Sequence, residues 1–369
     1  MPTLSLCLIA RNEEQNIERC LSSVRGLVDE IIVVDTGSTD RTKEIVRRFT
    51  EKIFDLPWNN DFAAAKNEAL KQATGDWILV LDADEGVSSP DHDRIKEALR
   101  NPSAIAFTFI LRNYTNDARA AGWTSREGDS YEESLAASGW WEVPKIRLFK
   151  NNLGITYSGK IHESVYPSIQ GTGGIQGGIP GEIMALSIPI HHYGHLDLKR
   201  QAQKKTIYEQ LQKEKIGVGN GAENDYYSHF ELARQLLMNN KVDEAKQAVE
   251  TSLQHNGHYF QSWFLLGTIH LLQEKWDEAL AALERAWILN PGFGATSSNL
   301  GIVYARKKLY QQAIEQFLQA IELNPKDANA WKNLGLCFDE MGEKEKAYRA
   351  LKRAVELNPA YKEIIKLEL

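Results

Sequence analysis

Three carboxylates directly follow a stretch with the composition of a buried strand: Asp82, Asp84 and Glu85 end the sequence LVLDADE at residues 79–85. Side chains two apart in an extended segment point to the same side, so we expect Asp82 and Asp84 to face one direction, with Ala83 between them. Two oxygen ligands placed in this way suit Mg²⁺ or Mn²⁺, especially an ion that also binds phosphate groups. The alternative is a capped turn in which the carboxylates accept backbone N–H groups. A further carboxylate, Asp35, ends another predicted strand and favours the metal site.

The elements that must position these residues alternate between strands and helices. Apolar runs predict strands at 4–10, 30–37, 52–56 and 76–85, and amphipathic patterns predict helices at 12–24, 39–49 and 63–74. Strands rich in Ile and Val that alternate with helices indicate an α/β, Rossmann-like domain with a mostly parallel sheet. Ligands of such sheets bind beyond the carboxyl ends of the strands, where both Asp35 and Asp82 are expected.

The second half of the chain repeats itself. The pairs Leu266-Gly267, Leu300-Gly301 and Leu334-Gly335 follow one another at steps of 34 residues, and alanines and prolines further along keep this step. This pattern resembles the tetratricopeptide repeat. It predicts an all-α domain over residues 226–369, with four repeats at 226–259, 260–293, 294–327 and 328–361 that bury a continuous core. Such repeats often bind a peptide or another subunit, but the pattern alone does not identify the partner.

The composition sets limits on the kind of protein. A net charge of −7 argues against general nucleic-acid binding, although a small anionic ligand is compatible with it. Three scattered cysteines favour a reducing compartment, and the run LSLCLIA has the features of a first strand and not of a signal peptide. No apolar run approaches the ~18 residues of a membrane span. We therefore expect a cytoplasmic protein without a transmembrane segment.

The N-terminal motifs resemble a known family. LSLCLIARNEEQNIERCLSSV, DEIIVVDTGSTDRT, WNNDFAAAKNEAL and GDWILVLDADE together are similar to family 2 glycosyltransferases of the GT-A fold. The resemblance implies an inverting transfer from a nucleotide sugar, usually a UDP-sugar, with Mn²⁺ or Mg²⁺ as cofactor. It further implies the roles of single residues: Ala10, Asp35, Lys66, Asp82, Ala83 and Asp84 in donor binding, and Asp84 in holding the metal. A solvated helix charge is the alternative for Lys66.

An inverting transferase also needs a general base, which we expect after residue 100. Four of the nine histidines lie between residues 162 and 195. A narrower group of GT-A domains followed by tetratricopeptide repeats is similar to this chain in the segments KIRLFKN, GKIHES and HHYGH, and this group includes SunS-type peptide S-glycosyltransferases. WaaE-type lipopolysaccharide-core transferases share the N-terminal motifs and the His-Glu pair. The resemblance implies Glu163 as the base, His162 as its neighbour in the acceptor site, and His192 as a metal or diphosphate ligand. A salt bridge to Lys160 or Lys145 is the alternative for Glu163.

These observations define one expected organisation. A GT-A domain at residues 1–195 is followed by a linking helix and loop at 196–225 and by the repeats. The expected activity is hexosyl transfer to a peptide or protein side chain, with the repeats recruiting the acceptor or pairing two subunits. A transferase building a lipopolysaccharide or lipid-linked glycan and a non-catalytic nucleotide-sugar-binding scaffold stay open as alternatives. Two further features have an undecided role: the tryptophans Trp140 and Trp141, and the glycine-rich stretch 171–181.

Overall fold

The computed structural model describes residues 2–118, 120, 122–160, 163–170, 181–198, 201, 206–210, 213 and 226–362. The chain forms two compact units. The first comprises Met1–Asp117 and Arg126–Leu198, and the second comprises Ala118–Ser125 and Lys199–Leu369. Most of the predicted linking segment 196–225 and of the glycine-rich stretch 171–181 lies outside the described residues, as does His162.

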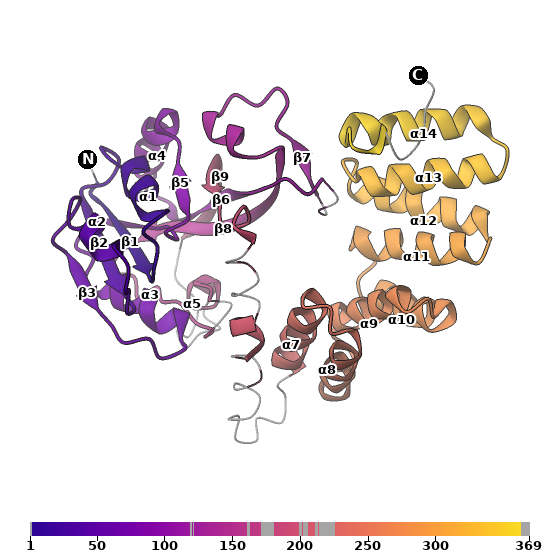
Figure 1. Cartoon of the computed structure of the whole chain (residues 1–369), viewed down its shortest axis with the longest axis horizontal. Helices are drawn as coiled ribbons and strands as arrows, with labels where there is room; N and C mark the ends of the chain where they lie inside the picture. Colours follow the sequence, from indigo (N-terminus) through magenta and orange to yellow (C-terminus); the bar gives the residue numbers. More distant parts are fainter. Residues whose placement is uncertain are drawn as a thin grey trace. The chain divides into compact units, whose positions relative to one another are not determined.

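The first unit is a sheet with helices packed against it (Figure 1). Its strands are β1 (Leu4–Ala10), β2 (Glu30–Asp35), β3 (Ile53–Asp55), β4 (Trp77–Val80), β5 (Glu85–Val87), β6 (Ala104–Thr115), β8 (Gly139–Lys150) and β9 (Glu182–His192). They follow the order β3-β2-β1-β4-β8-β6-β9-β5. The first four pair in parallel, as predicted. The sheet as a whole is mixed, because β8 is antiparallel to β4 and β6, and β5 is antiparallel to β9.

Helices cover this sheet because its strands are apolar on both faces. The helical segments are α1 (Ile17–Ser23), α2 (Thr42–Val46), α3 (Phe62–Lys71), α4 (His92–Ala98) and α5 (Tyr166–Gln170), with 3-10 turns at Ser89–Asp91 and Glu132–Ala136. Along β1, Leu4, Leu6 and Leu8 pack in the same core cluster as residues of α1, whereas Cys7 packs with residues of α3. Side chains of a strand alternate between faces, so this one strand contributes to both cores.

The second unit contains the predicted helical repeats. Its helices are α7 (Tyr226–Met238), α8 (Val242–His255), α9 (Phe260–Leu272), α10 (Trp276–Leu289), α11 (Gly294–Arg306), α12 (Tyr310–Leu323), α13 (Ala328–Glu340) and α14 (Lys344–Leu357), and it also includes the short strand β7 (Thr124–Ser125). The odd-numbered helices start at a constant step of 34 residues. No helix among the described residues is long and apolar enough to cross a membrane.

The repeated Leu-Gly pairs have a packing cause. A Cβ added to Gly301 would lie 2.6 Å from a ring carbon of Phe317 on the partner helix, and at Gly335 it would lie 2.6 Å from Leu351 Cγ. Real Cβ atoms do not approach other carbons this closely, so the two helices of a repeat reach this separation only with glycine at the contact. The glycines recur every 34 residues because each repeat contains one such close contact between its two helices.

Candidate active site

Ala10 and Asp35 lie side by side at the carboxyl edge of the parallel strands, because they are register partners at the ends of β1 and β2. Asp35 is buried, and its Oδ1 accepts hydrogen bonds from the backbone N–H groups of Gly37 (3.0 Å) and Ser38 (2.8 Å). Its Oδ2 is buried without a hydrogen-bond partner among the described residues. A buried acceptor is costly when no donor reaches it, so this oxygen suits a hydroxyl or N–H group of a ligand.

The sequence LVLDADE does not continue as a strand to its end. β4 ends at Val80, and the chain then turns, so that the backbone N–H of Glu85 donates to the carbonyl oxygen of Asp82 at 2.9 Å. Oε2 of Glu85 accepts from the backbone N–H of Asp82, also at 2.9 Å. The predicted extended geometry of Asp82 and Asp84 is therefore wrong, and the two carboxylates contact different partners. Ala83, between them, is buried in the core.

Two buried cations contact Asp82. Lys66 Nζ, on α3, lies 2.9 Å from Asp82 Oδ1 and 2.7 Å from Glu163 Oε1. Arg147 Nη2, on β8, donates to Asp82 Oδ2 at 2.9 Å and forms an ion pair with Glu85. The side chains of Lys66 and Arg147 are each only 3% exposed. Lys66 is therefore no solvated helix charge, and the alternative of a Glu163 pair with Lys160 or Lys145 is replaced by a pair with Lys66.

The charged side chains of this cluster shift one another's pKa values. Burial alone would lower the pKa of Lys66, but the carboxylates of Asp82 and Glu163 raise it above its usual value. Burial would raise the pKa of Asp82, yet Lys66 and Arg147 hold it well below its usual range. Complete burial raises the pKa of Glu85 although Arg147 opposes that shift. Lys66 and Asp82 are thus both charged at neutral pH, as a compensated pair.

Asp84 faces a histidine on the neighbouring element. His192 Nε2 lies 3.6 Å from Asp84 Oδ1, and His192 Nδ1 is 2.7 Å from Asn113 Oδ1. Burial would lower the pKa of His192, but Asp84 raises it. Gly194 keeps the space between the two side chains open, because a Cβ there would lie 2.4 Å from Asp84 Oδ2 and 2.7 Å from His192 Nε2. The asparagine fixes the ring so that Nε2 faces the carboxylate, an arrangement typical of metal-binding histidines.

The residues present fit a divalent cation only in part. Asp84 and His192 supply one oxygen and one nitrogen donor, and Gly194 leaves room beside them. No group of three or more His, Cys, Asp or Glu side chains in the described part of the chain is arranged to hold a metal ion. A cation at this place would need further ligands from a bound phosphate or from water, as Mg²⁺ does when it binds together with a nucleotide.

Asn67, next to Lys66 on α3, has a structural role. Its Nδ2 donates to the carbonyl oxygen of Tyr157 (2.9 Å), and its Oδ1 accepts from the backbone N–H of Tyr157 (2.7 Å). Both ends of the amide are thereby bonded to one residue of the segment that leads to Glu163. The Asn67 side chain therefore fixes this segment against α3.

Arg147 was missed in the sequence, and Lys145 was considered only as a partner of Glu163. Arg147 and Lys145 stand two apart on β8, and Arg147 together with burial lowers the pKa of Lys145. Two cations on one face of a strand next to an acidic turn are a signal that the motif KIRLFK contains. The two tryptophans differ: Trp140 is buried and donates to Glu142 Oε1 (3.1 Å), whereas the half-buried Trp141 has its ring 4.6 Å from that of His195. The His195 ring lies 5.1 Å from His192.

Residues 5–162 match the family described as glycosyl transferase family 2. Residues 328–361 match the tetratricopeptide repeat, residues 309–342 match a second repeat family of this type, and residues 208–286 match the family named anaphase-promoting complex, cyclosome, subunit 3. The chain therefore combines a family 2 glycosyltransferase domain with C-terminal tetratricopeptide repeats, as the motifs predicted.

Relatives share parts of this organisation. The chain is 38% identical over 200 residues to a TPR repeat-containing protein of Synechococcus elongatus, covering 53% of this chain and 43% of the relative. It is 29% identical over 164 residues to the SPbeta prophage-derived glycosyltransferase SunS of Bacillus subtilis, covering 44% of this chain and 34% of the relative. An uncharacterized glycosyltransferase of Rickettsia typhi is 25% identical over 238 residues, covering 64% and 74%. The match thus spans less than half of the first two relatives. Among solved structures, MamA matches 45% of this chain and 98% of its own at 19% identity, with a TM-score of 0.39.

Proposed function

We propose that this chain is an inverting, metal-dependent glycosyltransferase that moves a sugar, a hexose, from a UDP-sugar to a peptide or protein side chain. One observation carries the proposal. Three groups lie at the edge of one sheet or in the ion-pair chain that ends there. They are Asp35 with its unused buried oxygen, the Asp84–His192 pair, and Glu163, a carboxylate that can act as base.

Donor binding follows from the residues at this edge. Asp35 Oδ2 accepts from a hydroxyl of the ribose or from the base, next to the main chain of Ala10. Asp82, Ala83 and the buried cation Lys66 line the diphosphate side. A diphosphate next to several carboxylates would be repelled, and the positive charges of Lys66 and Arg147 offset that repulsion.

Asp84 and His192 are the side chains that would hold a divalent cation, Mn²⁺ or Mg²⁺, in this proposal. When bound together with the donor, such an ion supplies Lewis-acid stabilisation of the departing diphosphate. The protein's own part is to orient the His192 ring, which Asn113 does, and to leave room beside the two side chains, which Gly194 does.

Glu163 is the proposed general base. Among the described residues only its Oε1 is used, by Lys66, so Oε2 can accept a proton from the acceptor. As that proton leaves, the acceptor atom bonds to the anomeric carbon, and the bond from this carbon to the diphosphate oxygen breaks on the opposite face. Lys66 fixes the direction of the carboxylate, and His162 is its proposed neighbour in the acceptor site.

The acceptor class rests on the repeats. A helical-repeat groove suits an extended or helical polypeptide, so we propose that the repeats recruit a peptide or protein acceptor. Pairing of two copies through the repeats and a cytoplasmic location belong to the same proposal. The cysteines fit a reducing compartment, since Cys7, Cys20 and Cys337 are free and buried.

Calorimetry with UDP and Mn²⁺ tests the donor half, with the unmodified chain and Asp84→Ala compared. Binding of UDP that requires Mn²⁺ and is lost in the variant supports the proposal. Asp93→Ala is a matched control, because Asp93 lies on α4 and is exposed. Absence of UDP binding in all three proteins would overturn the proposed donor, and UDP binding without turnover of any UDP-hexose would favour a nucleotide-sugar-binding scaffold.

A further inference from the structure

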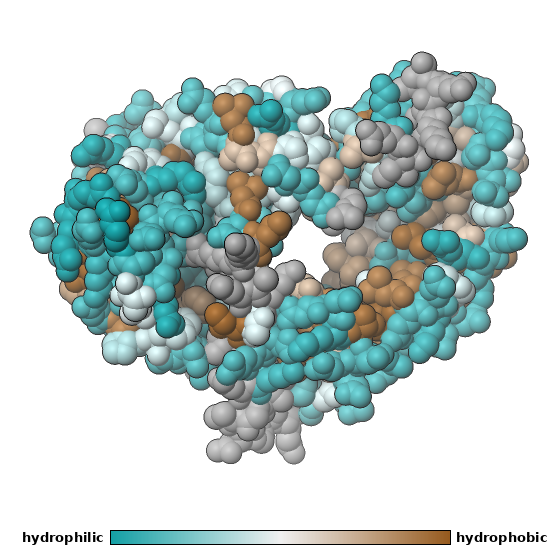
Figure 2. All heavy atoms as spheres, viewed as in Figure 1, coloured by the Kyte–Doolittle hydropathy of each residue, from teal (hydrophilic) through white to brown (hydrophobic). Residues whose placement is uncertain are grey.

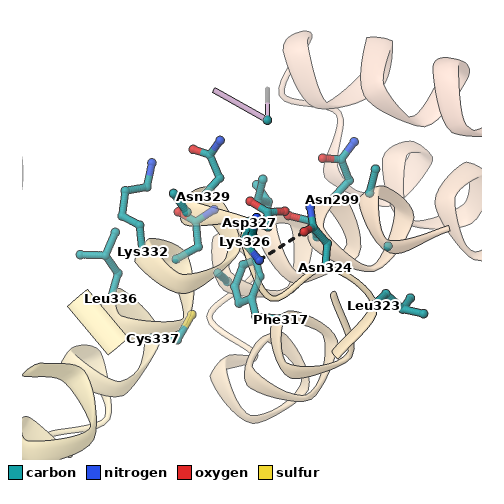
Figure 3. A pocket seen from close by; sticks show the side chains of 18 of the residues that line it. Asn299, Phe317, Leu323, Asn324, Lys326, Asp327, Asn329, Lys332, Leu336 and Cys337 are labelled. Carbon is teal, nitrogen blue, oxygen red and sulfur yellow. Dashed lines mark hydrogen bonds between the residues drawn. The ribbon is translucent and has the colours of Figure 1, made fainter. Parts of the chain in front are cut away.

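The second unit contains a cavity of about 1060 Å³ that we call the repeat groove. It is lined by residues of the helices α9, α11 and α13, among them Phe264, Asn299 and Lys332, and by Ala120, Gly122 and Trp123. Figure 3 shows Asn299, Asn329 and Lys332 pointing to the same open side of their helices. In Figure 2 hydrophobic side chains gather over α9 and α11. The groove is thus apolar at one end and carries amides and cations at the other.

One wall of this groove comes from a distant part of the sequence. Ala118–Ser125, which we call the inserted segment, belongs to the second unit together with the repeats. The side chain of Asn358, at the end of α14, donates from Nδ2 to the carbonyl oxygen of Ala118 at 2.7 Å, across 240 positions of the chain. This hydrogen bond recognises main chain and not a side chain. The groove can therefore make it with any extended peptide.

The inserted segment fills the groove incompletely. A cavity is left between it and the helices, and a Cβ added to Gly122 would meet no atom within 4 Å. The indole N–H of Trp123 is buried without a hydrogen-bond partner among the described residues. An unpaired buried donor of this kind costs about 1–3 kcal/mol. This unpaired donor weakens the hold of the segment on the groove, so an incoming peptide that pairs more groups can displace it there.

The charges of the groove indicate the kind of peptide. Arg306, Lys326 and Lys332 line it, and in the described part of the chain none of them forms an ion pair. Of the acids in the lining, Asp327 caps α13 through Ala330 N (3.0 Å), and Glu340 accepts from a tyrosine hydroxyl. The lining therefore carries three cations against two acids, and the inserted segment contains one arginine and no acidic residue.

We propose that the repeat groove binds an extended acidic peptide and that the inserted segment occupies it as an internal competitor. The proposal deepens the recruitment of a polypeptide acceptor and rests on that proposed function for the role of the incoming peptide. Occupation by a segment of the same chain acts at an effective concentration on the order of millimolar, so a free peptide at micromolar concentration competes poorly. Weakening the segment should therefore open the groove.

The test measures binding of a fluorescent peptide with the sequence of residues 116–127 to the full chain by anisotropy, without any sugar donor. We expect Trp123→Ala in the protein to raise the affinity for this peptide at least tenfold, because the resident segment loses its ring while the free peptide keeps it. A peptide carrying Arg119→Glu should bind more tightly still, and added salt should weaken it. Equal binding to the unmodified chain and to Trp123→Ala would overturn the internal competition.

A groove variant shows where the peptide binds. Asn358→Asp keeps the oxygen that accepts from Ala360 N (3.1 Å) but loses the donor to Ala118. Added to Trp123→Ala, it should reduce peptide binding at least tenfold. Asn290→Asp is the matched control at the same position two repeats earlier, where the side chain likewise accepts from Gly292 N (3.2 Å). Equal effects of the two changes, or no peptide binding to any variant, would refute the groove as the site. Since no donor is present, failure of the transferase proposal leaves this result unaffected.

Discussion

Lys66→Met tests whether the buried ion-pair chain of the site is integral to the fold. The Lys66 ammonium is 3% exposed and lies within 3 Å of two carboxylates, at 2.9 Å from Asp82 and 2.7 Å from Glu163. Methionine keeps an unbranched apolar side chain that reaches as far as Cε, so the change removes mainly the charged ammonium group. Both carboxylates then lose a partner that water cannot fully replace.

The expected cost follows from the exposure of those carboxylates. Removing one partner of a fully buried ion pair costs about 3–5 kcal/mol. The side chains of Asp82 and Glu163 are 35% and 17% exposed, so water solvates them in part after the change. Asp82 also keeps Arg147. We therefore expect the free energy of unfolding to fall by about 2–3 kcal/mol, below the cost for a fully buried pair.

Urea unfolding followed by far-UV circular dichroism measures this loss. Lys71→Met on the same helix is the control, because Lys71 is 69% exposed and pairs with Glu68 at the surface; we expect it to cost less than about 0.5 kcal/mol. Adding Glu163→Gln to Lys66→Met should restore about 1 kcal/mol by removing one unpaired carboxylate. If Lys66→Met and Lys71→Met unfold at the same urea concentration, the cluster does not support the fold and the assigned role of Lys66 is wrong.

Three further changes test other parts of the structure. Burial would raise the pKa of Glu30, but hydrogen bonds from its neighbours lower this pKa to about 2. The ionised Glu30 therefore stabilises the fold fully above the usual pKa of 4.5, and this stabilisation is lost as the pH falls through about 2. Glu30→Gln should therefore cost about 2 kcal/mol at pH 7, and the difference from the unmodified chain in urea unfolding should vanish between pH 4.5 and 2. Gly194→Ala should weaken Mn²⁺-dependent UDP binding at least tenfold in calorimetry, because its Cβ would collide with Asp84; unchanged binding would exclude Asp84 from the metal site. Gly301→Ala should cost about 1–3 kcal/mol of unfolding free energy by overpacking. Gly257→Ala, where the added Cβ makes only an ordinary contact at 3.6 Å, should be nearly neutral. Equal costs of the two changes would contradict the close-contact explanation.

The fold could be predicted because its signals are local and repeated. The alternation along β1 and the 34-residue step of Gly267, Gly301 and Gly335 each reflect a packing rule that acts within a few residues or between two adjacent helices. The antiparallel pairings of the sheet were not predicted, since β8 pairs with β4 and β9 pairs with β5, each far away in the sequence.

The turn at residues 82–85 was mispredicted for a related reason. The apolar run before it continues the strand pattern, and nothing within the motif shows that a cation 62 to 65 positions away will pair with both of its outer carboxylates. Lys66 looks like an exposed helix charge until Glu163, 97 positions later, is placed beside it. The inserted segment also lacks any local sign that it will join the repeats. In each case the residues themselves can be recognised in the sequence, but their environment depends on partners far away along the chain.

The ion pairs of the site link the proposed donor and acceptor residues into one chain of contacts. Glu163 is bound to Lys66, Lys66 to Asp82, and Asp82 to Arg147, which also holds the turn through Glu85. The position of the proposed base therefore depends on the same turn that carries Asp84. A change in this chain of contacts should alter the rate of transfer together with donor affinity, because no member can move without leaving a buried charge uncompensated. Carboxylates that bound only a metal and a donor would need no such cations, so we infer that Lys66 and Arg147 hold an acidic turn in place next to the proposed anionic donor.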